Sequence, residues 1–299
     1  MASNEIPLIE AHGLVKHYDG FSLENVSLSV FEGEVVGFVG KNGAGKSTTI
    51  KALLGLIAVD GGEAEILGTP SGMLSRMEGA AVKERVGVVF DAVSLPGHLT
   101  VADVGRVHAI AFAGWDAHHF ERLISEFELS KDKQVKDLSR GMGMKLSLAC
   151  ALAHDPQVLV LDEATAGLDP MARDEVLDHL REFVAKPGRA ILMSSHITSD
   201  LERIADRIIC IDSGHIVFDM PKDDITDEAG VARCRATDFD RVVASGVIPN
   251  GELHYLKREY GIDLLVSDRF AFVERFPDIP CDRMTIDDYL SLTLKGDTR

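Results

Sequence analysis

The pattern of apolar and polar positions predicts a strand, a loop and a helix early in the chain. Apolar side chains alternate with polar ones over residues 21–30, and a second apolar stretch covers residues 34–39. Alternation with a period of two is typical of a strand with one buried face. Over residues 47–57, leucine and isoleucine recur at helical spacing and stop at Gly55 and a turn at 60–62. We therefore expect a strand that leads through a glycine-rich loop into a helix.

Strands and helices alternate through the middle of the chain. Residues 100–127 have a helical pattern that breaks at 114–116, and we interpret this block as a helical insert. We expect strands at 86–90, 158–161, 190–194 and 207–211, and helices at 139–153 and 171–184. Strands that alternate with helices predict an α/β fold, in which a parallel sheet is covered by helices on both faces.

The pattern changes after Pro221, where an acidic run precedes several short apolar segments. The run comprises Asp223, Asp224, Asp227 and Glu228, and we interpret it as a solvated linker face. At 299 residues the chain is long enough for one large core and a smaller one. We therefore predict a main domain over 1–220, with the helical insert at about 91–153, and a small C-terminal α+β accessory domain over 221–299.

Composition and charge exclude several classes of protein. Hydrophobic residues make up 45% of the chain and charged residues 26%. No segment approaches the roughly 20 consecutive apolar residues of a membrane-spanning helix. The formal net charge of −17 disfavours non-specific binding to nucleic acid, because most of the surface would repel phosphate groups. We expect no nucleic-acid partner.

The cysteines and the N-terminal residues favour a cytoplasmic location. The four cysteines lie far apart with no Cys-x-x-Cys, which argues against a zinc site and against a disulfide framework. The first ten residues carry two acidic residues and no lysine or arginine, unlike a secretory signal. We expect a cytoplasmic protein with reduced thiols.

A phosphate-binding motif follows the second predicted strand. Residues 40–47 read Gly-Lys-Asn-Gly-Ala-Gly-Lys-Ser, which satisfies the pattern G-x-x-x-x-G-K-[ST]. Backbone N–H groups of such a loop converge on a polyphosphate, and the helix N-terminus adds positive potential. We expect Lys46 to contact the β- and γ-phosphates, Ser47 to bind Mg²⁺ and Thr48 to reach the α-phosphate. The nucleotide-binding residues predicted in this segment are Gly40, Asn42, Gly43, Ala44, Gly45, Lys46, Ser47 and Thr48.

Two carboxylates end the apolar run at 158–161. A buried strand of a parallel sheet delivers such residues to the sheet edge where ligands bind. We expect Asp162 to hold Mg²⁺ and Glu163 to act as the general base that orients and deprotonates the attacking water. Asp-Glu after an apolar run is by itself more often the exposed end of a strand. Its combination with the phosphate loop favours catalysis.

Together these motifs resemble the ATP-binding cassette (ABC) family, and in particular the nucleotide-binding subunits of bacterial ABC exporters. The most specific part is the family signature, for which residues 138–142 read Leu-Ser-Arg-Gly-Met. Taken alone, Ser139 is typical of a helix N-cap. The resemblance implies that Ser139 and Gly141 face the γ-phosphate of ATP held by a second subunit. It also places Asp169 in a loop that crosses the same dimer interface.

The resemblance gives roles to two further residues. Tyr18, 22 residues before Gly40, matches the aromatic residue that stacks on adenine, and core packing is an equal alternative. His196 follows the predicted strand at 190–194 and matches the histidine that contacts the γ-phosphate. We count His196 with Glu163 as catalytic.

Four positions depart from the family pattern, and one of them is Ala164, where the family usually has proline after the catalytic acid. Asp91 stands where the family has a glutamine that binds Mg²⁺ and senses the membrane partner, and its carboxylate adds negative charge beside the phosphates. Asp91, Ser47 and Asp162 form the predicted metal set. In the signature, Arg140 and Met142 replace a glycine and a glutamine.

The resemblance also implies an architecture and partners. We expect a P-loop NTPase core, an N-terminal antiparallel β subdomain, the ligands ATP and Mg²⁺, and a second ABC subunit that is identical or different. The helical insert is expected to dock on a separate membrane-spanning subunit at the inner face of the membrane, so that ATP hydrolysis powers export. The alternative is a soluble ABC ATPase that acts on ribosomes or DNA. A single cassette with a short insert favours transport.

Overall fold

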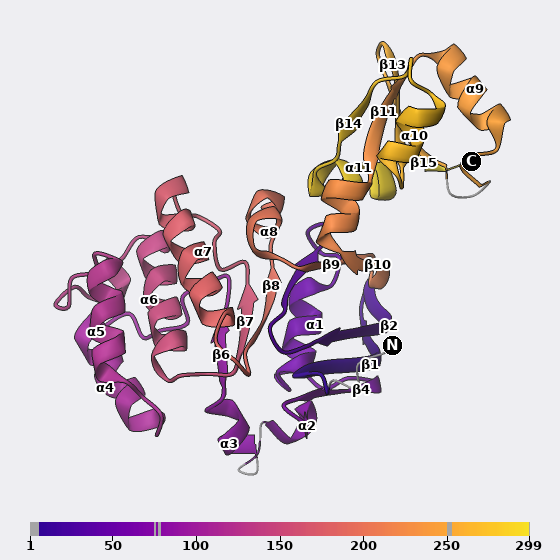
Figure 1. Ribbon diagram of the computed structural model, residues 1–299. Helices are drawn as coiled ribbons and strands as arrows, with labels where there is room; N and C mark the ends of the chain where they lie inside the picture. The colour runs from indigo at the N-terminus through magenta and orange to yellow at the C-terminus, as the bar shows by residue number, and fades with distance from the viewer. Residues whose placement is uncertain (1–5, 75, 77–78, 250–252, 299) are drawn as a thin grey trace. The chain divides into compact units, whose positions relative to one another are not determined.

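The computed structural model describes residues 6–74, 76, 79–249 and 253–298, and it divides into two compact units (Figure 1). The first comprises Met1–Asp200 and Ile209–Phe218, and the second comprises Leu201–Ile208 and Asp219–Arg299. Within the described residues, no helix combines the length and the apolar character needed to cross a bilayer.

The first unit begins with an antiparallel sheet of four strands in the order β2-β1-β4-β5. The strands are β1 (Ile9–Tyr18), β2 (Phe21–Val30), β4 (Gly61–Ile66) and β5 (Thr69–Pro70). This sheet confirms the predicted N-terminal β subdomain and the predicted strand at 21–30. The alternation in β1 is interrupted by register shifts on either side of Leu14, which is why the pattern alone did not indicate this strand.

A second sheet of six strands in the order β10-β9-β3-β8-β7-β6 forms the centre of the fold. The strands are β3 (Val35–Val39), β6 (Val86–Val89), β7 (Val158–Asp162), β8 (Ala190–Ser194), β9 (Arg207–Asp212) and β10 (His215–Pro221). Strands β3, β8, β7 and β6 pair in parallel, and every residue of β3, β7 and β8 is buried. Burial on both faces explains their continuous apolar sequences, and the predicted α/β class is confirmed.

Helices cover this sheet and form the predicted insert (Figure 1). They are α1 (Lys46–Leu53), α2 (Ser71–Leu74), α3 (Ala80–Lys83), α4 (Val101–Ala111), α5 (Ala117–Glu126), α6 (Arg140–Ala153), α7 (Pro170–Val184) and α8 (Thr198–Ile204). Helices α4 and α5 are separated at the break expected from the sequence, because Asp116 caps α5 by accepting the N–H of His119 at 2.9 Å. Trp115 packs against Phe120 and His108 and anchors this connection.

Helix α1 is shorter than the predicted 47–57. It ends at Leu53, and Gly55 takes a φ of 65°. A Cβ at Gly55 would lie 2.0 Å from the carbonyl oxygen of Ser71. A left-handed glycine in close contact with another segment stops the helix, although apolar residues continue at helical spacing.

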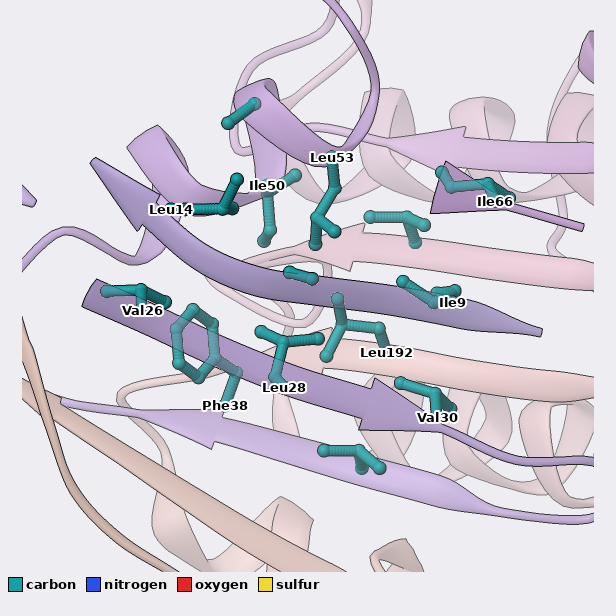
Figure 2. Packing of buried hydrophobic residues seen from close by; sticks show 14 of the residues in the cluster. Ile9, Leu14, Val26, Leu28, Val30, Phe38, Ile50, Leu53, Ile66 and Leu192 are labelled. Atoms are coloured by element: carbon teal, nitrogen blue, oxygen red, sulfur yellow. The ribbon is translucent and has the colours of Figure 1, made fainter. Parts of the chain in front are cut away.

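The main core lies between the antiparallel sheet, the central sheet and α1. Figure 2 shows side chains from both sheets and α1 in one cluster, among them Ile9 of β1, Leu28 of β2, Phe38 of β3, Ile50 of α1 and Leu192 of β8. All five are buried, with at most 4% of their surface exposed. This packing fixes α1 and the loop before it against both sheets.

The second unit contains an antiparallel sheet of five strands in the order β14-β11-β13-β12-β15. Its elements are β11 (Gly230–Cys234), α9 (Ala236–Ser245), β12 (His254–Arg258), β13 (Gly261–Val266), α10 (Arg269–Arg275), β14 (Cys281–Arg283), α11 (Ile286–Lys295) and β15 (Asp297–Thr298). Its own core includes Ala232, Leu264 and Phe272. This part of the chain therefore has the α+β character expected for it.

Candidate functional site

The loop between β3 and α1 is shaped by glycines at positions where a side chain would strain the backbone or meet a neighbouring atom. Gly43 and Gly45 have φ values of 80° and 119°. A Cβ at Gly40 would lie 2.1 Å from the carbonyl oxygen of Ile211, and one at Gly45 would lie 2.6 Å from Leu23 Cδ2. The loop backbone is thus pressed against the fold, and its N–H groups stay free of obstructing side chains.

Lys46 lies inside this loop and is 7% exposed. Its Nζ donates to the carbonyl oxygen of Gly40 at 2.7 Å and to that of Lys41 at 3.4 Å. Glu163 Oε1 lies 3.9 Å from the same Nζ. A buried ammonium group surrounded by these oxygens is positioned to exchange carbonyl contacts for phosphate oxygens.

A hollow of about 700 Å³ opens in front of the loop. It is lined by Gly20, Phe21, Lys41, Asn42, Gly43, Gly45, Lys46, Ser47, Thr48, Asp91, Arg140, Glu163, Ala166 and His196. Of the residues predicted from the phosphate motif, Gly40 and Ala44 shape the loop from behind, and the others reach the hollow. Gly20, Phe21, Lys41, Arg140 and Ala166 also line the hollow, although the sequence did not predict them as residues of this site.

Tyr18 lies at the end of β1 and is 46% exposed, so core packing does not explain it. Lys16 Nζ is 5.5 Å from the centre of its ring. Its direct partner across the hairpin is Phe21, which lines the hollow itself. The cross-strand register could have indicated Phe21, because a residue paired with a predicted site residue lies beside it.

Asp162 and Glu163 follow one another at the end of β7 but face different surroundings. Asp162 is 2% exposed, and its Oδ1 accepts a hydrogen bond from Ser194 Oγ at 2.6 Å. Glu163 lies in the hollow with a φ of 55°, and its N–H donates to both the carbonyl and the hydroxyl oxygen of Ser194 at 3.2 Å. The left-handed backbone is strained for a non-glycine residue, and the two bonds to Ser194 hold Glu163 in this conformation at the hollow.

His196 contacts Glu163 on the rim of the hollow. The His196 N–H donates to Glu163 Oε2 at 3.3 Å, and His196 Nδ1 contacts the same oxygen. The histidine side chain is 56% exposed, whereas that of Glu163 is 16% exposed. The structure therefore brings Lys46, Glu163 and His196 together from three separate segments of the chain.

The three residues predicted to act on a second subunit do not line the hollow of their own chain. Ser139 caps α6 by accepting the N–H of Met142 at 3.2 Å, and it is exposed. Asp169 caps α7 by accepting the N–H groups of Met171 and Ala172 at 3.0 Å, and these bonds lower the pKa of its carboxyl group. A Cβ at Gly141 would lie 3.3 Å from the carbonyl oxygen of Gly167, so this glycine packs the start of α6 onto the loop before α7.

The donor set fits Mg²⁺ only if the nucleotide supplies ligands as well. Ser47 and Asp91 line the hollow, and Asp162 lies behind it with one oxygen committed to Ser194. Within the described residues, no three His, Cys, Asp or Glu side chains form a metal-binding group. Mg²⁺ is usually bound through one or two protein oxygens together with phosphates and water, and these residues fit that mode.

Comparison with known proteins agrees with this geometry. The family profile described as "ABC transporter" matches residues 23–166. A curated relative, the Nod factor export ATP-binding protein I of Burkholderia orbicola, is 39% identical over 213 residues, which cover 69% of this chain and 68% of the relative. The chain belongs to the ABC transporter family. The protein of the same name from Neorhizobium galegae is 34% identical over 232 residues and is covered over 64% of its length.

Solved structures give the same result for the fold of this ABC protein. An ATP-binding subunit of an ABC transporter aligns with a TM-score of 0.66 and 32% identity, over 73% of this chain and 91% of that chain. A dimeric ATP-binding cassette bound to ADP and Pi after hydrolysis aligns with a TM-score of 0.65 and 22% identity, over 71% of this chain and 98% of that chain. The second likeness shows the fold alone. The architecture and motif set are those of an ABC ATPase.

Proposed function

We propose that the protein hydrolyses ATP at an interface between two cassettes and powers export through a separate membrane-spanning subunit. The convergence of Lys46, Glu163 and His196 on one hollow carries this proposal. The carboxylate of Glu163 lies within contact distance of both the phosphate-binding cation and the imidazole, an arrangement suited to phosphoryl transfer to water.

Each residue has a role that follows from its place. Lys46 would bind the β- and γ-phosphates, and Thr48, in the first turn of α1, would reach the α-phosphate at the helix N-terminus. Glu163 would orient the attacking water and accept its proton. His196 contacts the side chain of Glu163 and lies on the rim of the hollow, where it would contact the γ-phosphate.

Mg²⁺, when bound with ATP, would neutralise charge on the β- and γ-phosphate oxygens. Ser47 would hold it through its hydroxyl group and Asp162 from behind the hollow, with Asp91 as a further oxygen donor. Ser194 would keep the Asp162 carboxylate oriented, because its hydroxyl group donates to Asp162 Oδ1.

A second cassette would complete the site. Ser139, Gly141 and Asp169 lie outside the hollow of their own chain, and both Ser139 and Asp169 are exposed helix caps. Exposed helix starts can bind the anion of another chain. We propose that they close over the nucleotide of a second copy or of a different ABC subunit, so that ATP holds two chains together.

Mixing two inactive variants tests the shared site. Lys46→Ala removes the ammonium group that binds the phosphates, and Ser139→Ala removes the hydroxyl group that caps α6. Each variant alone should therefore lack activity. In their mixed dimer, one site combines the intact Lys46 of one chain with the intact Ser139 of the other. An equimolar mixture should recover about a quarter of the wild-type rate, since half the dimers are mixed and each holds one intact site. A mixture as inactive as its components would contradict a site shared between two copies of this chain.

A groove of about 320 Å³ in the first unit supports a membrane partner. Its apolar lining comes from α2, β6 and α6 and from the residues that directly follow α1, β6 and α4, and it includes Leu54, Leu74, Val88, Phe90, Phe112 and Ala151. Phe90 and Ala92 line the groove, whereas Asp91 between them lines the nucleotide hollow. A segment bound in the groove would therefore touch the same loop as the nucleotide, which gives a direct route for coupling.

The names of the relatives favour export, and we propose export for this protein on that ground. It would act at the inner face of the membrane, bound to its membrane-spanning subunit. No observation in the described residues favours the alternative of a ribosome or DNA ATPase, and the net charge of −17 opposes it.

Purification from solubilised membranes tests the partner. Ile110 on α4 is 88% exposed, and Ile110→Glu should release the protein from its membrane-spanning companion while ATP binding persists. Tyr260 in the second unit is also 88% exposed, so Tyr260→Glu is a matched control that should stay bound. Recovery of the wild type without any membrane-spanning companion would contradict the transport function.

A further inference from the structure

The two departures from the family pattern that change charge meet in the structure. Asp91 follows β6, and Arg140 is the first residue of α6, 49 positions later. Arg140 Nη2 donates to the carbonyl oxygen of Asp91 at 3.4 Å. Both residues line the same hollow as Lys46 and Glu163. A residue that adds a negative charge and a residue that adds a positive charge are therefore neighbours.

The aliphatic part of the exposed Arg140 side chain lies close to the loop before α7. A Cβ at Gly167 would lie 3.1 Å from Arg140 Cδ, so the aliphatic part of Arg140 passes over this glycine. Gly167 has a φ of 83°. The guanidinium group is thus directed by its stem toward the loop that carries Asp91, and Ala166 beside Gly167 also lines the hollow.

The charges around the hollow show why Arg140 matters. Its lining contains three permanent cations, Lys41, Lys46 and Arg140, and two carboxylates, Asp91 and Glu163. Lys41 also pairs with Asp212 at 3.5 Å, and Lys46 lies 3.9 Å from Glu163. Without Arg140, carboxylates and cations would be equal in number in a site for a polyanion. The carboxylate of Asp91 would then repel the triphosphate with no additional cation to offset its charge.

We propose that Arg140 is a charge-compensating residue for Asp91 in the nucleotide site of its own chain. The guanidinium group, which lies beside Asp91 through its bond to the carbonyl oxygen of that residue, offsets the charge of the carboxylate, so that the loop after β6 can offer an oxygen donor without weakening the binding of ATP. The inference rests on the proposed function, because it requires ATP to occupy this hollow.

Calorimetric titration with ATP in the absence of divalent metal tests the pair through a double-mutant cycle. The variants are Asp91→Asn, Arg140→Met and the double variant. Asparagine keeps the shape of aspartate, and methionine keeps an unbranched stem and a good helix propensity. We expect Arg140→Met to raise the Kd of ATP about tenfold in the wild-type background and less than threefold in the background of Asp91→Asn. Coupling of this size is usual for residues in one network.

Two further variants serve as controls. Arg140→Lys keeps the charge and should leave the Kd within about threefold of wild type. Arg122→Met removes one positive charge from the same helical insert, on α5 and outside the hollow, and should leave the Kd unchanged. The tenfold effect of Arg140→Met should also shrink as the salt concentration rises, because added ions screen the repulsion.

The outcomes separate this inference from the function on which it rests. If the wild type does not bind ATP, the proposed function is refuted, and the compensating role of Arg140 is refuted with it. If the wild type binds ATP but Arg140→Met weakens binding by the same factor in both backgrounds, the two residues act independently and only this inference is overturned. An Arg140→Met variant with wild-type affinity has the same consequence. Circular dichroism confirms that each variant is folded.

Discussion

Replacing Glu163 by glutamine removes the proposed general base while keeping the size of the side chain. Glu163 Oε2 accepts the N–H of His196, and Oε1 lies 3.9 Å from Lys46 Nζ. The amide oxygen of glutamine can still accept the backbone N–H, so the local geometry should persist. The proton acceptor is lost, because an amide is not a base at neutral pH.

The expected loss of turnover is roughly 100-fold or more, the usual scale for a positioned acid–base group. A factor of 100 corresponds to about 2.7 kcal/mol in the activation free energy. Binding of ATP should not weaken. The Glu163 and Lys46 side chains are 16% and 8% exposed, and their attraction at this distance is about 4 kcal/mol before desolvation is subtracted. Glutamine frees the Lys46 ammonium for the phosphates and removes a negative charge beside them.

Single-turnover phosphate release measures the chemical step, calorimetry measures ATP affinity, and sedimentation measures dimer formation. The variant should bind ATP at least as tightly as the wild type and accumulate as an ATP-bound dimer. Glu175→Gln on α7 is a matched control. Its carboxylate pairs with Lys145 at 2.7 Å, away from the hollow, and phosphate release should stay near normal. Near-normal release by Glu163→Gln would remove Glu163 from the mechanism.

Three further predictions concern binding, the shape of the loop and pH. Lys46→Ala should abolish ATP binding because it deletes the buried cation of the cradle, and an unchanged calorimetric affinity would contradict its role. Gly40→Ala should lower the free energy of unfolding by about 2–4 kcal/mol, since its Cβ would overlap the carbonyl oxygen of Ile211. Gly43→Ala meets no atom within 4 Å and should cost only about 1 kcal/mol, so equal losses in chemical denaturation would refute the steric argument. Burial lowers the pKa of His154 below its ordinary value of 6.5. The stability that the neutral His154 side chain contributes is therefore complete above pH 6.5 and is lost as the pH falls toward the pKa of the folded protein. His154→Asn should reduce this loss of stability at low pH, and a variant with the same pH dependence of unfolding as the wild type would contradict the role of His154.

Much of the fold was predictable because its signals are local. The continuous apolar runs of β3, β7 and β8 follow from burial on both faces of a parallel sheet. The break between α4 and α5 appears in the sequence as Asp116, whose side chain caps the second helix. The length of α1 was not predictable, since the contact between Gly55 and Ser71 depends on a segment outside the helix.

The residues of the nucleotide site also divide into those that a single segment predicts and those that depend on contacts between segments. The phosphate loop is one short segment, and the Asp162–Glu163 pair ends one strand, so residue type and order are enough to predict them. Phe21 and Arg140 were missed because each enters the hollow from another element. Ser194 was also missed, although its hydroxyl group joins Asp162 to the backbone of Glu163, because the link spans two neighbouring strands.

The sequence by itself determined the α/β class, the phosphate loop, the carboxylate pair and the ABC signature, because these depend on residue type at fixed spacing along one segment. Only the tertiary structure decided which side chains share the hollow, that Asp91 and Arg140 are neighbours, and that Ser139, Gly141 and Asp169 lie outside it. The physical reason is that charge and hydrogen bonding act over a few ångströms in space. The packing of the sheets and helices, rather than the order of residues, sets those distances.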